Sequence, residues 1–360
     1  RYEATVFARQ WRNAERFPGH RVVAVERIPD GRRRLASAWY ALTGRSVILE
    51  RAMAEGRFDV VHAHFGHNGI YAMGPARRLG LPLVVSLHGR DVSVLAGSDK
   101  YRPSWWHYLV RYRRLFREAS LFLAASQDLK DLFVAAGCPA EKVEVFRLGI
   151  DLEAFRPGDG GEPGGEPTVL MIGRFVEKKG HVFGIRAAAR ARAAGARLRL
   201  VIVGEGPLGG EYRSLARTLG IEDMLELPGA LPHVEVKRLL QGAAVLLAPS
   251  CVAGNRDRDS GLIVAKEASA CGVPVIGTVH GGIPDIVEHG RTGFLVPERD
   301  DGAIAGHLAS LLGDLEQQRA MGRAGREKME REYDIRERVR ALESVYDRVR
   351  GLSGRPGGGT

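Results

Sequence analysis

The sequence predicts an α/β protein made of two parallel, doubly wound domains, and three observations support this prediction. Short apolar strand patterns alternate with helical patterns along most of the chain, which is typical of parallel sheets with helices on both faces. The alternation is interrupted at 157–167, where almost every residue is Gly, Pro or acidic, as in a linker. The length of 360 residues is enough for two domains.

The first half contains the strand and helix patterns of one such domain. Ser126 stands where an N-cap would begin a helix. The predicted helices are 4–16, 103–118 and 126–136, and the predicted strands are 21–25, 58–64, 81–87, 121–125 and 142–147.

The same alternation restarts after the linker and ends in a charged tail. The tail, 314–350, is helical with a break near Tyr333–Asp334. The predicted strands are 168–172, 198–203, 225–227, 244–247 and 274–276, and the predicted helices are 180–194, 208–219, 233–241, 262–270 and one that starts at Pro284.

Composition excludes some classes of protein. The chain is 44% hydrophobic but has no apolar run of about 18 residues, so no membrane-spanning helix is expected. The three cysteines (Cys138, Cys251, Cys271) have the spacing of neither a zinc site nor a disulfide framework. We therefore expect a cytoplasmic protein without a structural metal.

The charge of the chain is uneven. Residues 1–150 contain 24 Lys and Arg against 14 Asp and Glu, whereas the remainder contains 29 of each. One interpretation of this positive charge is that the first half binds an anionic partner, which could be a nucleic acid, a lipid headgroup or a polyprenyl-diphosphate acceptor. The other interpretation is an Arg-rich soluble surface. The segment 105–114 is both aromatic and basic, which is compatible with core packing and with contact to an anionic membrane at the inner face.

Two loops at predicted strand ends are suited to a diphosphate. The loop Gly173–Gly180 combines two glycines with Arg174, Lys178 and Lys179, and strand ends are where doubly wound sheets bind ligands. Gly261 and the Gly281–Gly282 turn each precede a predicted helix, and helix N-termini attract anions. Glu267, within the first of these helices, could accept sugar hydroxyls.

Two further patterns suggest competing chemistry. Gly204–Gly209 reads G-E-G-P-L-G after a strand, which fits the dinucleotide fingerprint. However, the strand is the second of its domain, and Pro207 removes a backbone N–H. Asp257-Arg258-Asp259 resembles a magnesium-binding pair of carboxylates, but a chance match in a charged loop is the favoured interpretation, because Arg174 and Lys179 already supply positive charge for a diphosphate.

These residues together resemble the donor site of retaining glycosyltransferases with the GT-B fold, in particular glycosyltransferase family 4. The resemblance rests on Pro249-Ser250, Gly261-Leu262, Glu267-Ala268, Ala270–Val275 and Gly281–Asp285. It implies two Rossmann-like domains that face a central cleft. The first is an acceptor-side domain, 1–156, and the second a donor-binding domain, 168–335, with a last helix, about 336–352, that crosses back onto the first.

The resemblance also implies roles for individual residues on the donor side. Arg174 and Lys179 match the pair that binds the diphosphate, and Glu267 matches the ligand of the ribose. Asp259 has the spacing of the acid that contacts the sugar, while Ser260 could instead replace that acid. The remaining donor-binding positions are Gly173, Gly204, Leu227, Gly261, Leu262 and Ile263.

On the acceptor side, two strand ends resemble the motifs of members that build exopolysaccharides and lipopolysaccharides. These are His62-Ala63-His64-Phe65-Gly66 and His88-Gly89-Arg90-Asp91. The implied acceptor-side residues are His64, Gly66, Arg90 and Asp91, and His88 is an implied catalytic residue. Structural histidines are the alternative. In the family, a strand and a glycine-rich loop precede the position of Arg1, so the acceptor site is expected to be incomplete here.

The function expected from the resemblance is retaining transfer of a hexose from a UDP- or GDP-sugar to a glycan, lipid-linked or small-molecule acceptor. No cofactor and no metal are expected, and His88, Arg174, Lys179 and Asp259 are the expected catalytic residues. A nucleotide-sugar epimerase of the same fold and an NAD(P)-dependent Rossmann enzyme remain alternatives. A nucleic-acid binder would leave the donor motifs without a purpose.

Overall fold

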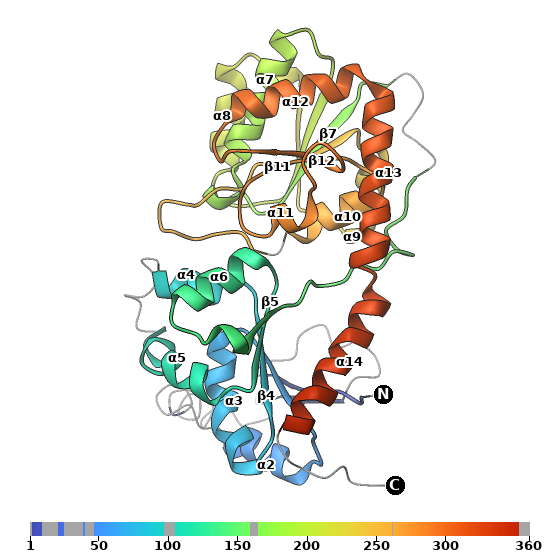
Figure 1. Cartoon of the computed structure of the whole chain (residues 1–360). Coiled ribbons are helices and arrows are strands. Elements are labelled where there is room, and N and C mark those ends of the chain that lie inside the picture. The colour runs from blue at the N-terminus through green and yellow to red at the C-terminus, as the bar shows by residue number, and fades with distance from the viewer. Residues whose placement is uncertain are drawn as a thin grey trace. The chain divides into compact units, whose positions relative to one another are not determined.

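The chain forms two compact units, each built on its own parallel sheet (Figure 1). The computed structural model describes residues 2–8, 21–24, 39, 47–96, 105–158, 165–260 and 262–352. Unit 1 comprises Arg1–Ala124, Lys130–Val145 and Val339–Thr360, and unit 2 comprises Ala125–Leu129 and Phe146–Arg338. The segment that follows Val145 therefore groups with unit 2, before the predicted domain end at 156.

Unit 1 contains a four-stranded parallel sheet of order β3-β4-β5-β6. Every residue of β4 and β5 is buried, as expected of strands with helices on both faces. The strands are β3 (Val61–His64), β4 (Leu83–Leu87), β5 (Leu121–Ala124) and β6 (Val143–Val145).

Near the N-terminus, the predicted helix at 4–16 is wrong over its described part. Thr5–Ala8 forms a strand, β1, which pairs in parallel with β2 (Arg21–Ala24). The β-branched and aromatic residues Thr5, Val6 and Phe7 favour a strand. The strand forms by pairing with β2, which is distant in sequence and so was not evident from the local pattern. Residues 9–16 lie outside the described residues.

Helices flank the sheet of unit 1, and their inner faces form its core. Phe116 packs edge-on against Phe122 of β5 at 5.7 Å between ring centroids and also contacts Phe133. Ser126 caps α6, since its Oγ accepts the N–H of Leu129 at 3.2 Å. The helices that lie wholly or partly in this unit are α2 (Val47–Glu55), α3 (Gly66–Leu79), α4 (Arg90–Ala96), α5 (Trp106–Glu118), α6 (Gln127–Ala135), η5 (Ala140–Lys142) and α14 (Ile335–Leu352).

Unit 2 contains a six-stranded parallel sheet of order β12-β11-β10-β7-β8-β9. The chain enters at β7 and winds outward first to β9 and then, from β10, to β12. This is the doubly wound arrangement, with its switch point between β7 and β10. The strands are β7 (Thr168–Ile172), β8 (Arg199–Val203), β9 (Leu225–Gly229), β10 (Val245–Ala248), β11 (Val275–Thr278) and β12 (Gly293–Val296).

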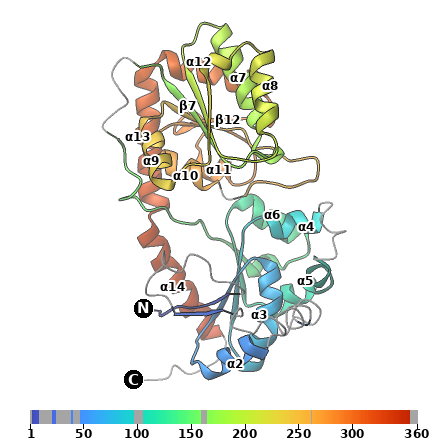
Figure 2. The ribbon, with the colours of Figure 1, turned by 180° about the vertical axis from the view of Figure 1, so that it is seen from behind.

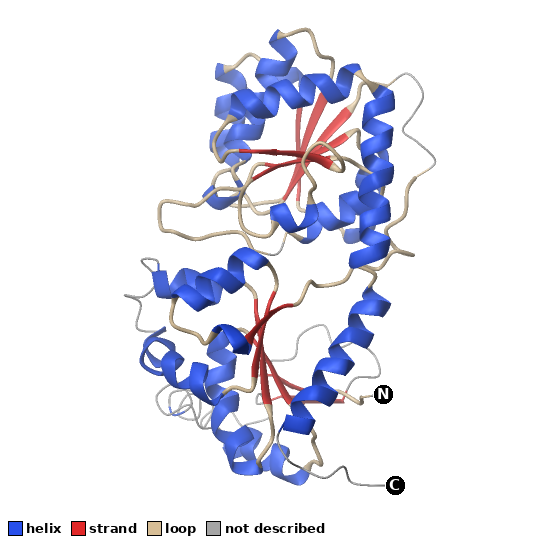
Figure 3. Ribbon diagram, in the orientation of Figure 1, coloured by secondary structure: helices blue, strands red, loops and turns tan. Residues whose placement is uncertain are grey.

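Helices cover both faces of this sheet (Figures 2 and 3). One layer consists of α7, α8 and α12, and the other of α9, α10, α11 and α13. Their bounds are α7 (His181–Ala193), α8 (Gly209–Thr218), α9 (His233–Gly242), α10 (Ile263–Ala270), α11 (Ile283–Ile286), α12 (Asp301–Gly313) and α13 (Leu315–Glu332), with short turns η6 (Glu177–Lys179) and η7 (Glu222–Met224).

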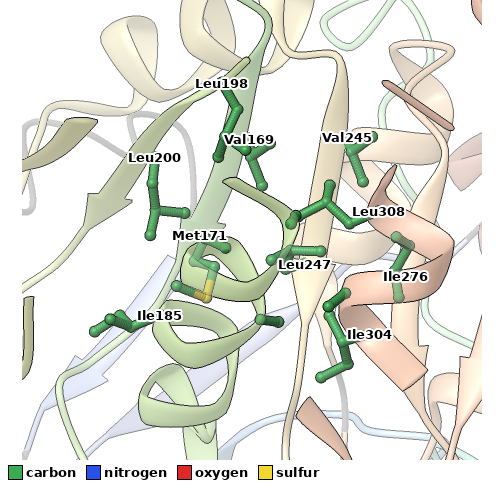
Figure 4. Packing of buried hydrophobic residues seen from close by; sticks show 14 of the residues in the cluster. Val169, Met171, Ile185, Leu198, Leu200, Val245, Leu247, Ile276, Ile304 and Leu308 are labelled. Atoms are coloured by element: carbon green, nitrogen blue, oxygen red, sulfur yellow. The ribbon is translucent and has the colours of Figure 1, made fainter. Parts of the chain in front are cut away.

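Alternate residues along each strand belong to different cores. Val169 and Met171 pack with Ile185 of α7 and Leu308 of α12 (Figure 4), whereas Leu170, between them, packs on the opposite face. This period of two is a consequence of strand geometry. No helix among the described residues has the length and apolar character that a membrane crossing needs.

Candidate functional site

Glycines allow the loops after β7 and β8 to lie directly against each other. A Cβ on Gly204 would collide with the carbonyl oxygen of Gly173, and one on Gly206 would lie 2.5 Å from the carbonyl oxygen of Phe175. The two loops are joined by a hydrogen bond from the N–H of Phe175 to the carbonyl of Glu205, at 2.8 Å. The glycines of the G-x-G-x-x-G pattern therefore serve packing between strand ends, which gives them a purpose without a dinucleotide.

Lys179 lies in the middle of this edge of the sheet. Its aliphatic chain covers Gly173, where an added Cβ would be 3.0 Å from Lys179 Cε. Its ammonium forms an ion pair with Asp259, at 2.6 Å between Nζ and Oδ2, and Ser250 Oγ donates to the same oxygen at 3.2 Å. The structure thus brings together Gly173, Lys179, Gly204 and Asp259, from the ends of three strands.

Asp259 is ionised in this environment. Its side chain is only 14% exposed, and burial alone would raise the pKa of the carboxyl. The nearby Lys179 ammonium, helped by Lys178, outweighs burial and holds the pKa of Asp259 below its usual range. The result is a fixed anion beside a fixed cation at the switch point of the sheet.

The neighbouring charges of the loop between β10 and α10 are paired in the same way. Lys178 Nζ lies 3.0 Å from Asp257 Oδ2, and Arg258 Nη2 donates to Asp128 Oδ1 at 2.9 Å. The two carboxylates of Asp257-Arg258-Asp259 therefore face different ammonium groups. Within the ranges that the structure describes, no cluster of three or more His, Cys, Asp or Glu side chains could hold a metal ion.

The second glycine turn packs on the end of this loop. Gly281, at φ 53°, would bring a Cβ into the carbonyl oxygen of Asp259, and a Cβ on Gly282 would lie 2.8 Å from the carbonyl oxygen of Ser260. The Gly281–Gly282 turn is thus in backbone contact with Asp259 and Ser260, the two residues before Gly261. Gly261 itself lies outside the described residues.

The other predicted donor-side residues have distinct surroundings. Glu267 is buried in α10, and burial raises the pKa of its carboxyl, opposed by a hydrogen bond with His233 at 3.5 Å. Leu262 is buried in the core, whereas Ile263, the first residue of α10, is 51% exposed. Leu227 in β9 packs its side chain on the core.

Arg174 differs from the other basic residues of its loop. Its side chain is exposed and, within the described ranges, forms no hydrogen bond or ion pair, while its carbonyl accepts the N–H of Val176 at 2.8 Å. It follows Gly173 directly and is therefore adjacent in the chain to the glycine that Lys179 covers. Arg174 is a cation available to a ligand at this edge.

Two residues of the site have no counterpart in the sequence-based prediction. His280 is buried and bonds the backbone of Asp259, and Glu298 bonds His280. They follow β11 and β12 respectively, so both lie at the same edge of the sheet as the other residues. A histidine directly before the Gly281–Gly282 turn is the signal that could have identified one of them.

In unit 1, the ends of β3 and β4 are joined through Asp91. The Asp91 carboxylate accepts the backbone N–H of Gly66 at 2.5 Å and that of His88 at 3.0 Å. It is buried, and burial raises the pKa of its carboxyl against these hydrogen bonds. Asp91 therefore positions both loops from within. Arg90, beside it, extends over the Trp105 ring at 5.4 Å.

Three histidines form a stacked row at the same end of this sheet. The rings of His62 and His64 are 4.8 Å apart and those of His64 and His88 are 5.3 Å apart. His64 Nδ1 and His88 Nε2 share a hydrogen bond of 3.0 Å. Burial lowers the pKa of His62 to about 3 and that of His88 to about 4, and it also lowers that of His64. All three are neutral near pH 7.

The end of the row is fixed by the C-terminal helix. His62 bonds Tyr346 Oη of α14 through Nδ1 at 2.6 Å and Ser86 Oγ through Nε2 at 2.8 Å. Its alternation with Ala63, which is buried on the other face, places His62 and His64 on one face as predicted. His62 thus has a structural set of partners, while His64 is exposed.

Comparison with known proteins gives a consistent result along the chain. Residues 1–154 match the family described as "Glycosyltransferase Family 4", and residues 155–328 match "Glycosyl transferases group 1". A putative colanic acid biosynthesis glycosyltransferase, WcaL of Salmonella typhimurium, is 36% identical over 76% of this chain and 69% of its own.

Two further similarities cover more of the chain. A GDP-mannose-dependent α-(1-6)-phosphatidylinositol monomannoside mannosyltransferase of Mycobacterium tuberculosis is 31% identical over 90% of this chain and 84% of its own. The crystal structure of HepE from Anabaena with UDP-glucose has a TM-score of 0.73 at 19% identity, covering 94% of this chain and 91% of that one.

Proposed function

We infer the reaction from one premise, that the chain belongs to the glycosyltransferases of group 1 and family 4 and has the GT-B fold. We propose that it transfers a hexose from a UDP- or GDP-sugar to a glycan, lipid-linked or small-molecule acceptor, with retention of the anomeric configuration. Relatives that act in colanic acid biosynthesis and on a phosphatidylinositol mannoside support such acceptors.

One observation carries the donor-side proposal. Lys179 is held against Gly173 by Asp259 at the switch point of the six-stranded sheet, beside the exposed Arg174. Strand ends at a switch point are where this sheet type binds ligands. Arg174 and Lys179 would neutralise the charge that develops on the leaving diphosphate. A metal is not needed for that charge, so we propose a metal-independent reaction.

The remaining roles follow from where the side chains lie. Asp259 would accept a hydrogen bond from the sugar and Glu267 one from the ribose. The backbone N–H groups of Gly261, Leu262 and Ile263 would receive the β-phosphate, and Ile263 is the first residue of α10. Gly204 would contribute to the donor site by letting its loop lie against Gly173, and the backbone near Leu227 would contact the base.

No side chain of this set is an obvious covalent nucleophile. We therefore propose front-face attack, in which the departing phosphate takes the proton of the acceptor hydroxyl. On unit 1, His64, Gly66, Arg90 and Asp91 would form the acceptor side. The neutral His88 would donate a hydrogen bond to the reacting groups.

The test is nucleotide binding followed by turnover. Binding of UDP and of GDP is measured by calorimetry, once with Mg²⁺ and once with EDTA. We expect one of the two nucleotides to bind equally well in EDTA. Arg174→Ala should lose about 2–4 kcal/mol of transition-state stabilisation, roughly 30- to 1,000-fold in kcat. Arg319→Ala, an exposed arginine of α13, is the matched control. Near-normal turnover of the Arg174 variant would exclude the proposed role, and an inverted product by NMR would exclude retention.

We also propose a cytoplasmic location with peripheral contact to an anionic membrane. Trp106 and Val110 on α5 are 62% and 81% exposed, so core packing does not account for them. Arg113 and Arg114 on the same helix are exposed too, as in interfacial helices. Trp106→Ser with Val110→Ser should reduce sedimentation with phosphatidylglycerol vesicles. Val234→Ser, 61% exposed in unit 2, should not. Equal sedimentation of all variants would refute the contact.

A further inference from the structure

A buried imidazole and a partly exposed carboxylate together hold both ends of the loop that carries Asp259. Glu298 Oε2 accepts the N–H of Val252, near the start of the loop, at 2.9 Å. Glu298 Oε1 lies 2.7 Å from His280 Nδ1, and His280 Nε2 accepts the N–H of Asp259 at 3.0 Å. The two loop ends are thus connected through a single chain of three hydrogen bonds.

The chemistry of these bonds fixes the protonation of His280. A backbone N–H can only donate, so Nε2 must be the acceptor and carry no proton. Nδ1 then carries the proton and donates it to Glu298. Burial alone would raise the pKa of Glu298, but the bonds from Val252 and His280 hold it below its usual range. Glu298 is therefore an ionised acceptor for both donors.

The position of the pair makes it relevant to the site. The His280 side chain is fully buried, and no part of it is free to reach a ligand. Its bond is to the residue whose carboxylate holds Lys179. A displacement of the Asp259 backbone would move the carboxylate and, with it, the Lys179 ammonium.

We propose that His280 and Glu298 are positioning residues for the donor site, which set the place of Asp259 and Lys179 without touching the donor. This inference rests on the proposed function, because it assumes that Lys179 binds a diphosphate. It adds two residues that neither the motifs nor the glycine turns include.

An isosteric variant separates positioning from packing. In Glu298→Gln, one carboxylate oxygen becomes an NH₂ group, which can only donate. If the NH₂ group faces Val252, it opposes that N–H. If it faces His280, the ring must move its proton to Nε2, which then opposes the N–H of Asp259. Either orientation loses one bond of the chain.

The experiment measures loop protection and nucleotide affinity together. Hydrogen exchange of peptides that cover 250–262 should become faster in Glu298→Gln, while the rest of unit 2 stays protected. The Kd of the nucleoside diphosphate that binds the wild type, UDP or GDP, should rise roughly 10- to 100-fold, as for outer-shell partners of other sites. His280→Leu should behave likewise, and His280→Gln, which keeps an acceptor, should be milder.

Glu288→Gln is the matched control. Glu288 is also a partly exposed carboxylate of unit 2, but it pairs with Lys328 and Arg291, away from the loop. A Kd within twofold of wild type in both Glu298→Gln and His280→Leu would overturn the proposal. The proposal would also be overturned if Glu288→Gln accelerated hydrogen exchange of the loop as much as Glu298→Gln does. Failure of the wild type to bind UDP or GDP would overturn the proposed function. Hydrogen exchange of the loop in the variants would then decide whether His280 and Glu298 hold the loop in place.

Discussion

Replacing Lys179 with methionine tests the ion pair at the centre of the site. Methionine keeps an aliphatic chain over Gly173 but removes the ammonium that lies 2.6 Å from Asp259. Both side chains are less than one-fifth exposed, at 18% and 14%. The variant therefore leaves a buried carboxylate without its main counter-charge.

The expected magnitude follows from that burial. Removing one partner of a buried ion pair costs about 3–5 kcal/mol, because the remaining charge stays desolvated. Ser250 still donates to Asp259 and neither side chain is completely buried, so we expect the lower end, about 3 kcal/mol at pH 7. Lys179→Met with Asp259→Asn should recover part of this loss, since no buried charge remains.

The loss should shrink as the pH falls. In the wild type the pKa of Asp259 is depressed, so the ion pair contributes stability above the unfolded pKa of about 3.9. That contribution disappears as the pH falls through the folded pKa. Without Lys179, burial would raise the pKa of Asp259. At low pH the carboxyl of the variant would be protonated, so the variant would no longer contain an unpaired buried charge and would lose less stability. The difference between the two proteins is therefore largest near pH 7.

Hydrogen exchange by mass spectrometry is the suitable assay, because all four tryptophans precede residue 107 and their fluorescence does not report on unit 2. Peptides from unit 1 provide an internal reference. Arg190→Met is the control variant, since Arg190 is 64% exposed in its pair with Asp301 and should lose much less. A loss in Lys179→Met no larger than in this control, or one independent of pH, would refute the reasoning.

Three other substitutions in unit 2 have definite expectations. Gly180→Ala should lower the free energy of unfolding by about 2 kcal/mol or more, because φ is 62° and a Cβ would collide with the carbonyl oxygen of Pro249. An unchanged Tm would contradict this. Arg326→Met should lose about 3 kcal/mol in urea unfolding, since the guanidinium donates to three backbone carbonyls, those of Phe155 and Ala270 through Nη1 and that of Leu152 through Nη2, and a loss below 1 kcal/mol would count against that role. Tyr333→Phe removes a 2.9 Å hydrogen bond to the carbonyl of Asp285 and should lower the free energy of unfolding by about 1 kcal/mol. An unchanged free energy of unfolding would show that this bond does not stabilise the protein.

The sequence predicts strands well where burial is continuous. Thr168–Ile172 is a strand with the predicted bounds, because an apolar run between polar ends needs no distant partner to be recognised. Thr5–Ala8 was predicted wrongly, because its partner is Arg21–Ala24 and pairing across a gap is not a local property. Ser126 was predicted correctly as a cap, since capping is decided within one turn.

The candidate site divides in the same way. Gly173, Lys179 and Gly204 were predicted because each stands at the end of a recognisable strand. His280 and Glu298 were not, because they follow different strands and meet only through the register of β11 and β12. Sequence spacing predicts which edge of the sheet a side chain reaches, but not which partner it bonds there.

The composition of unit 1 has a consequence for synthesis of the chain. Unit 1 includes residues from both ends of the sequence, and Tyr346 and Arg348 bond His62 and Glu144 within it. A ribosome adds about 5–20 residues per second and domains generally form as they emerge. Unit 2 ends at Arg338, so all of its residues are translated before the part of α14 that belongs to unit 1. Of the two units, unit 1 is thus the one whose translation begins earlier and is completed later.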